Sequence, residues 1–209
     1  MPKRRYPTYL YEAKAIKRGY IAIAGMDESG RGPLAGPVVA ACVILKKRNF
    51  INKIDDSKRM SGKMRLKAYK EILENAVYNI AAVSSETIDR INIYNSTKLA
   101  MEKAYAGLRQ RADYALIDGR IKPNIHCDYK SIVSGDRLSL SIACASILAK
   151  THRDMIMNFI HLMYPKYGFD THKGYGTIKH MRAIKKYGPT PLHRLTFAPM
   201  KHGFTKTEG

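Results

Sequence analysis

The chain has 209 residues, 45% of them apolar, which suits one globular domain or one domain with a small C-terminal addition. Lys and Arg number 37 against 17 Asp and Glu, so the net charge of +20 predicts a polyanionic partner, nucleic acid before acidic lipid. The basic N-terminus lacks the apolar stretch of a signal peptide, and the longest apolar run, residues 37–45, is too short to span a bilayer. We therefore expect a cytoplasmic protein that contacts no membrane.

The three cysteines form no CxxC pair, which predicts neither a zinc site nor a disulfide framework.

Two apolar, β-rich runs, residues 20–26 and 37–45, are predicted as neighbouring buried strands separated by a loop rich in Gly and Pro. A weaker alternation predicts a third strand at residues 77–85. Strong helix formers with apolar residues at helical spacing predict a helix over residues 62–75.

Farther along, residues 95–111 are predicted as a helix, and residues 114–118 as a short strand that ends in a carboxylate. Another strand is expected near residues 130–134. The longest predicted helix covers residues 138–163 and stops before Pro165. Its first turns carry small side chains, which allow close packing on a sheet.

The C-terminal part differs in amino-acid composition from the rest of the chain. A loop rich in Tyr and Gly leads to a basic helix at residues 178–187, and a polar tail after Pro199 is expected to be mobile. Strands that alternate with helices predict an α/β fold. We expect residues 1–163 to form its core and residues 164–209 to pack on that core as a cap, within a single structural domain.

Four carboxylates lie at the ends of predicted core elements. Asp27 and Glu28 follow the first strand, Asp118 ends another, and Asp136 precedes the longest helix. Because burying a lone charge is costly, these acids are candidates for one site at a sheet edge that holds Mg²⁺ or Mn²⁺. Two such ions about 4 Å apart suit phosphoryl chemistry. For each acid alone a structural role stays open, namely a turn cap for Asp27, an Asp-Gly turn for Asp118 and a helix N-cap for Asp136.

The loop after the first strand combines that acidic pair with Gly30, Arg31 and Gly32. Glycines on both sides of an arginine let backbone amides approach a ligand closely while the guanidinium contacts phosphate. The loop matches neither a Walker A motif nor a GxGxxG fingerprint, which disfavours a nucleotide cofactor. The pattern indicates a metal and a phosphate.

Residues 27–41 (DESGRGPLAGPVVAA) closely resemble the signature of bacterial type 2 ribonucleases H, the ribonuclease HII family. Only about 20 residues precede the first strand, whereas type 3 relatives carry an additional N-terminal domain and lack the Gly-Arg-Gly element. The resemblance continues in order from about residue 20 to residue 200, through Asp56-Ser57-Lys58, Asp118-Gly119, Gly135-Asp136, SIACASILAK at 141–150, Arg153-Asp154, His172-Lys173-Gly174-Tyr175 and HRLTFAP at 193–199.

This resemblance implies a ribonuclease-H-like mixed β-sheet flanked by helices, with a C-terminal helical cap that helps to hold a duplex. It implies that Asp27, Glu28, Asp118 and Asp136 are catalytic acids that bind two Mg²⁺ or Mn²⁺ ions. The implied activity is endonucleolytic hydrolysis of the RNA strand of RNA–DNA hybrids, including single ribonucleotides in duplex DNA, with 3′-hydroxyl and 5′-phosphate products. The implied roles are the removal of misincorporated ribonucleotides and of RNA primers, by a monomer.

The resemblance also implies a set of substrate contacts. Gly30, Arg31 and Gly32 match the element that senses the 2′-hydroxyl of a ribonucleotide. Tyr175 matches the tyrosine that packs on the adjoining sugar at the RNA–DNA junction, and Lys58 matches a phosphate contact.

Three other functions stay open on the sequence. A basic nucleic-acid-binding module would explain the charge but not the four acids, and it would bind without hydrolysis. Another nuclease of the same broad fold, such as a junction nuclease, would cut without needing a ribonucleotide. Metal-free cleavage by paired histidines is disfavoured, because the seven histidines are scattered without recognisable pairing and are expected to be exposed or to contact the duplex.

Overall fold

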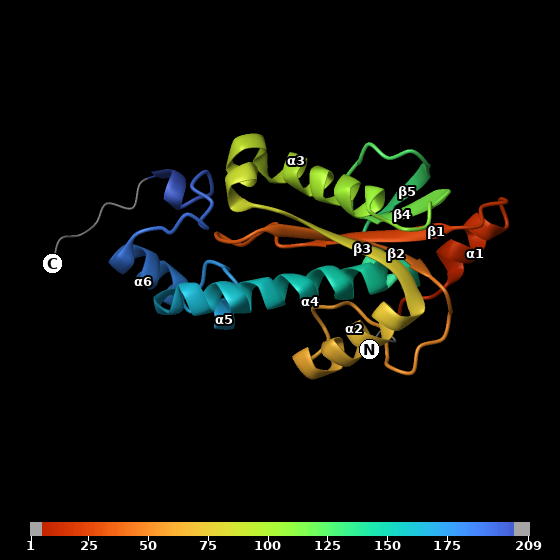
Figure 1. Ribbon diagram of the computed structural model, residues 1–209, viewed down its shortest axis with the longest axis horizontal. Helices are drawn as coiled ribbons and strands as arrows, with labels where there is room; N and C mark the ends of the chain where they lie inside the picture. The colour runs from red at the N-terminus through yellow and green to blue at the C-terminus, as the bar shows by residue number, and fades with distance from the viewer. Residues whose placement is uncertain (1–5, 203–209) are drawn as a thin grey trace, which may run out of the picture.

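The polypeptide forms a five-stranded mixed sheet between two layers of helices (Figure 1). The computed structural model describes residues 6–202, so the ends at residues 1–5 and 203–209, including most of the predicted mobile tail, lie outside it. The strands are β1 (Ile23–Ser29), β2 (Val38–Leu45), β3 (Ala76–Val83), β4 (Tyr114–Asp118) and β5 (Asp128–Ile132). The helices are α1 (Leu10–Ile16), α2 (Gly62–Asn75), α3 (Ser85–Ala106), α4 (Leu140–Met163), α5 (Phe169–His172) and α6 (Ile178–Tyr187), with 3₁₀ turns η1 (Gly135–Arg137), η2 (Pro165–Tyr167) and η3 (Met200–His202).

The strand order is β3-β2-β1-β4-β5. β1 pairs with β2 in antiparallel and with β4 in parallel orientation, so it lies at the centre of the sheet. β5 continues the parallel half, and β3 continues the antiparallel half. The predicted α/β fold with a mixed, helix-flanked sheet is confirmed.

Each face of the sheet has its own hydrophobic core. In Figure 1, α3 covers one face and α4 with α2 covers the other. Alternate residues of β2 divide between the two cores: Cys42 packs toward Met101 of α3, whereas Val43 packs toward Ile147 of α4. This alternation explains why β2 is apolar at every position, since both of its faces are buried. Cys42 and Cys144 are buried thiols, as the apolar runs around them predict.

Several predicted boundaries need correction. The first strand does not end before the acidic pair: β1 extends to Ser29, because Glu28 and Ser29 pair with Ala40 and Val39 of β2. The helix predicted to begin at residue 95 begins at Ser85. Ser84 caps it by accepting a hydrogen bond from the Thr87 amide, and a kink at Asn92 interrupts the helical periodicity. The helix α1 was not predicted. The helices expected at residues 62–75 and 178–187 and the strand at 114–118 are confirmed.

The C-terminal segment packs on the end of α4. Phe169 is fully buried and contacts Met157 of α4 together with Leu34 and Ala35 of the loop after β1. The contacts between Leu34 N and Gly174 O (2.8 Å) and between Arg194 N and Leu34 O (2.8 Å) tie the segment to the same loop. The cap therefore fixes the loop that follows the acidic strand.

Three histidines inside the cap are buried and adjacent, which corrects the expectation of scattered, exposed histidines. The Thr190 amide donates to Nδ1 of His193 (2.8 Å), so the neutral His193 ring donates from Nε2 to Nε2 of His180 (3.0 Å). His180 in turn donates from Nδ1 to the carbonyl oxygen of Tyr175 (3.0 Å). His172 stacks on His180 with ring centroids 4.4 Å apart. This chain of hydrogen bonds requires both bonded rings to be neutral.

Acidification is expected to weaken the cap. Burial lowers the pKa of His180 and of His193 to about 4, whereas the unfolded chain titrates near pH 6.5. Between these values the unfolded chain binds protons that the folded protein does not, so the free energy of unfolding falls as the pH falls. We expect a loss of up to about 1 kcal/mol per pH unit for each histidine in that window. Urea unfolding at pH 7 and pH 5 should show a smaller pH effect for His193→Gln than for the wild type, and equal pH effects would contradict the assignment.

Candidate active site

The four acids come together at one edge of the sheet, although they belong to three separate segments. β1 and β4 run parallel with Met26 opposite Ile117, so Asp27, the next residue of β1, lies beside Asp118 at the end of β4. Asp136 lies in η1, directly after β5 and its connecting turn. The Gly135 amide donates to Oδ1 of Asp118 (2.6 Å), which holds η1 against the end of β4.

These carboxylates are electrostatically unfavourable without a cation. Burial raises the pKa of Asp27 well above its usual range, and the neighbouring charges of Glu28 and Asp118 raise it further. Burial also raises the pKa of Glu28, although Arg31, 3.6 Å away, and Lys58 oppose the shift. Burial and the charge of Asp118 raise the pKa of Asp136. The nearby cations Arg31 and Lys58 thus do not offset the cost of burying these carboxylates close together.

This donor set fits divalent cations of the Mg²⁺ type. Within residues 6–202, no three His, Cys, Asp or Glu side chains stand close enough together to form a ready-made ligand cage. Mg²⁺ keeps several waters and needs only one or two carboxylates for each ion, so an open arrangement of oxygen ligands suits it. Asp27, Glu28, Asp118 and Asp136 would hold such ions. The raised pKa values of Asp27, Glu28 and Asp136, caused mainly by burial, give the physical reason for binding.

The structure also tests the alternative roles of single acids. Asp136 does not cap the longest helix: Ser139 is the N-cap, and its Oγ accepts a hydrogen bond from the Ile142 amide. Asp27 Oδ1 accepts from the Glu28 amide (2.7 Å), and the carboxyl also hydrogen-bonds to Ser146 of α4, so its bonding is not confined to a local turn cap. Local structure therefore accounts for part of the bonding of these acids but not for their convergence.

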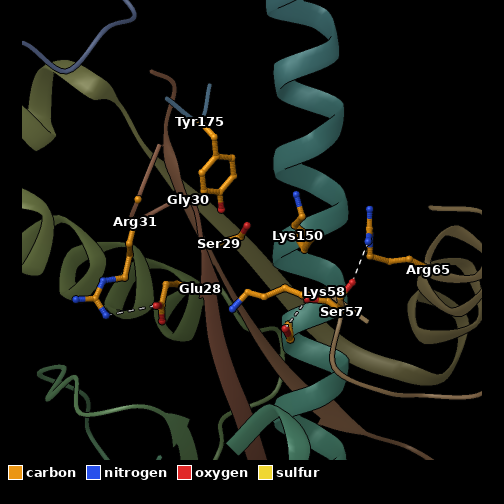
Figure 2. Close-up of a pocket in the computed structure, with 11 residues that line it drawn as sticks. Glu28, Ser29, Gly30, Arg31, Ser57, Lys58, Arg65, Lys150 and Tyr175 are labelled. Carbon is orange, nitrogen blue, oxygen red and sulfur yellow. Dashed lines mark hydrogen bonds and ion pairs between the residues drawn. The ribbon is translucent and has the colours of Figure 1, made fainter. Parts of the chain in front are cut away.

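A cavity of about 380 Å³ opens beside Glu28 (Figure 2). The loop Gly30-Arg31-Gly32 and Tyr175 line one side of it, and Lys58 lines the other. Figure 2 shows the ammonium end of Lys58 pointing toward Glu28. All the substrate contacts predicted from the sequence thus line one cavity at the acidic edge of the sheet.

The position of Lys58 follows from its neighbours in the chain. Asp56 is buried and accepts from the Lys58 amide (2.9 Å) and from Nε of Arg137 (3.1 Å). The Ser57 hydroxyl bonds to that of Ser146 on α4 (2.9 Å), which attaches the loop to the helix. The main chain at Lys58 is therefore fixed, while its side chain extends toward solvent and the cavity.

Two further cations line the same cavity and were not identified from the sequence. Lys150 of α4 donates to one oxygen of Asp154 (2.6 Å), and Arg65 of α2 donates to the other (3.1 Å). One carboxylate shared by two cations leaves net positive charge facing the cavity. Lys150 and Asp154 belong to motifs that carry the family resemblance, but their i,i+4 spacing is equally typical of a solvated helix face and indicated no substrate contact.

Comparison with known proteins identifies the family. The profile described as Ribonuclease HII matches residues 24–200. Ribonuclease HII of Chlamydia muridarum is 49% identical over 195 residues, which cover 92% of this chain and 89% of that protein. Ribonuclease HII of Caldicellulosiruptor bescii is 46% identical over 187 residues, covering 89% of this chain and 91% of that protein. The chain belongs to the ribonuclease HII family.

Membership makes the chain an endoribonuclease of the ribonuclease H type 2 class, and enzymes of this class need a divalent metal. The ribonuclease H2 structure from Pyrococcus horikoshii OT3 superposes with a TM-score of 0.74 at 21% identity, over 87% of this chain and 96% of that one. Bst-RNase HIII in complex with Mn²⁺ gives a TM-score of 0.66 at 19% identity, over 87% of this chain and 68% of that one. These neighbours confirm the predicted ribonuclease-H-like fold. Among residues 6–202, none of the helices has the length and hydropathy needed to span a bilayer.

Neutralising Asp27 should stabilise the metal-free ribonuclease HII fold. Because the pKa of Asp27 is raised in the folded protein, the ionised carboxylate lowers the free energy of unfolding at neutral pH. This loss is absent below the pKa of Asp27 in the unfolded chain and complete above its pKa in the folded protein. Asp27→Asn keeps the hydrogen bond from Glu28 and removes the charge, so Tm in EDTA should rise by about 2–4 °C. Mg²⁺ should raise the Tm of the wild type more than that of the variant. Thermal unfolding with EDTA and with Mg²⁺ tests both statements, and a lower Tm in EDTA for Asp27→Asn would show that the charge is compensated within the protein.

Proposed function

We propose that this protein cuts the RNA strand of RNA–DNA hybrids and also incises duplex DNA at single ribonucleotides. The observation that supports this proposal is the shared cavity, in which the Gly30–Gly32 loop and Tyr175 stand beside Glu28 at the acidic edge of the sheet. A cavity with backbone donors, an aromatic ring and adjacent carboxylates suits one sugar next to the phosphate that is cut. In the cell this activity would remove misincorporated ribonucleotides and RNA primers.

Each side of the cavity has a proposed task. The main chain of Gly30, Arg31 and Gly32 binds the 2′-hydroxyl, the group that distinguishes RNA from DNA. The Tyr175 ring packs on the following sugar. Lys58 and the Arg31 guanidinium contact phosphate, since Arg31 is half exposed and its ion pair with Glu28 is 3.6 Å long.

The four acids supply the metal ligands in this proposal. Two Mg²⁺ or Mn²⁺ ions, when bound, would activate a water and stabilise the leaving oxygen, which gives 3′-hydroxyl and 5′-phosphate ends. Asp27 and Asp118 are fixed by neighbouring parallel strands, and Asp136 is fixed through the bond between Gly135 and Asp118. This arrangement places the carboxylates on rigid elements, which holds their geometry before substrate binds.

The test is cleavage of a DNA duplex that contains one ribonucleotide, with Mg²⁺, Mn²⁺ or EDTA, beside an all-DNA duplex of the same sequence. We expect metal-dependent incision next to the ribonucleotide, a 5′-phosphate on the downstream product and no cutting of the all-DNA duplex. Binding without cleavage would instead identify a binding module. Equal cutting of the all-DNA duplex would identify another nuclease of this fold, and a cyclic phosphate product would show that the 2′-hydroxyl is the nucleophile.

A further inference from the structure

Two arginines behind the cavity are completely buried and are not accounted for by the proposed chemistry. Arg153 of α4 and Arg194, which follows α6, both have a relative exposure of 0%. Among residues 6–202, neither forms an ion pair with a carboxylate. Burial, and then the charge of Arg153, lower the pKa of Arg194 to about 9, which still leaves it protonated at neutral pH. Two buried, unpaired cations are costly for folding, so they need an explanation other than stability.

Arg194 donates only to main-chain carbonyl groups of the loop after β1. Its Nη2 contacts Gly30 O (2.6 Å) and Gly36 O (2.8 Å), and its Nη1 contacts Arg31 O (2.9 Å). Its Nε also donates to Gly36 O (3.1 Å). Nη1 and Nη2 therefore hold the backbone of the Gly-Arg-Gly element, and Nε and Nη2 hold the end of the same loop at Gly36.

Arg153 connects the same loop to the segment that carries Tyr175. Its Nη2 contacts Ala35 O (3.1 Å), its Nε contacts Pro37 O (3.0 Å), and its Nη1 contacts Lys173 O (3.0 Å). Lys173 is two residues before Tyr175. One side chain thus fixes the spacing between the loop after β1 and the segment that carries Tyr175.

The packing around these arginines leaves little freedom. Gly30 has φ +101°, and a Cβ there would overlap Nε of Arg153. Gly174 has φ +84°, and its Cβ would lie 2.5 Å from Ala35 O. Two independent reasons therefore favour glycine at both positions: the positive φ angle and the lack of space for a Cβ.

The direction of the carbonyl groups decides the direction of the amides. In a planar trans peptide the N–H points opposite to the C=O. Because Gly30 O and Arg31 O point at Arg194, the N–H groups of Arg31 and Gly32 point away from it. In the described part of the chain neither N–H donates to a protein acceptor, and both residues line the cavity. Two backbone donors are thus turned toward the place where a substrate oxygen would lie.

We propose that Arg194 and Arg153 are positioning residues for ribonucleotide recognition: Arg194 orients the Arg31 and Gly32 amides toward the 2′-hydroxyl, and Arg153 sets the distance from that loop to Tyr175. This inference rests on the proposed function. Neither guanidinium contacts the substrate. Lysine cannot replace them, because a single ammonium cannot bind three or more carbonyl groups in the fixed directions of a planar guanidinium fork.

The test measures affinity, so that it does not depend on turnover. Asp118→Asn serves as the background that keeps the substrate intact, and its Kd is measured in Mg²⁺ for a duplex with one ribonucleotide and for the matching all-DNA duplex. Adding Arg194→Lys should reduce the ratio of these affinities about 10-fold or more. The Kd for all-DNA should stay within about twofold, since the charge is retained. Arg182→Lys, on the exposed face of α6, is the matched control and should leave the ratio unchanged.

The outcomes separate the two proposals. If the background protein shows no preference for the ribonucleotide, the proposed function fails and this inference fails with it. If the preference exists and survives Arg194→Lys in a folded protein, only the inference is overturned, and a purely structural role would weaken both affinities alike. Should Arg194→Lys not fold, Arg153→Lys is measured in its place with the same expected loss, and an unchanged ratio there overturns the proposal.

Discussion

Asp118→Asn is expected to lower the cleavage rate at a single ribonucleotide by more than about 100-fold, since loss of a residue that merely supports a metal ligand already costs up to that factor. Asp118 is next to Asp27 across the parallel pair of β1 and β4, and its charge raises the pKa of both Asp27 and Asp136. It is therefore the acid that couples the other members of the site. Asparagine keeps an oxygen for the Gly135 amide, so the fold should persist while the charge that we propose attracts metal is lost.

The measurement is a single-turnover rate in saturating Mg²⁺, accompanied by thermal unfolding to establish that the variant is folded. Asp170→Asn is a matched control, because Asp170 is an exposed carboxylate in the cap that contacts only His161 and Thr171 among side chains of the described residues. Its rate should equal that of the wild type. If folded Asp118→Asn kept more than about a tenth of the wild-type activity, Asp118 would not be a metal ligand. The loss of a ligand is expected to lower the rate by more than that factor.

Gly25→Ala is expected to destabilise the protein by at least about 3 kcal/mol, the upper range for overpacking, because backbone rather than a flexible side chain opposes the new methyl group. A Cβ at Gly25 would overlap the main-chain carbonyl of Ser141 and the amide nitrogen of Ile142. α4 lies against β1 at this point, and the small residues of its first turns allow that approach, as the sequence predicts. The methyl group would have to displace the helix that carries Ser146 and Lys150.

Equilibrium urea unfolding measures this effect, and the matched substitution is Gly62→Ala. Gly62 is the first residue of α2, and a Cβ there would have nothing within 4 Å. Alanine should leave the stability unchanged or raise it by up to about 1 kcal/mol, because it reduces the conformational freedom of the unfolded chain. If Gly25→Ala cost no more than Gly62→Ala, α4 would have to be free to move away from the sheet.

The sequence by itself determined the elements whose pattern is local. Apolar runs predicted β2 and β4 within a residue, and helical spacing predicted α2. The resemblance selected Gly30, Arg31, Gly32, Lys58 and Tyr175, which line the cavity. Carboxylates at strand ends were recognisable because parallel strands bring their carboxyl ends together. Such patterns predict the folded structure, because they depend on neighbours in the chain and on one general rule of sheet geometry.

Only the tertiary structure decided where each charged or polar side chain went. β1 continues through Glu28 because β2 pairs with it, and Asp136 does not cap α4 because Ser139 does. Arg194 and His180 look like members of a basic, solvated tail in the sequence, yet both are fully buried. Their partners are carbonyl groups and rings distant in the chain, such as Gly30 O for Arg194 and the His193 ring for His180. Burial of a polar side chain depends on the partners that long-range packing provides, and no local pattern encodes those partners.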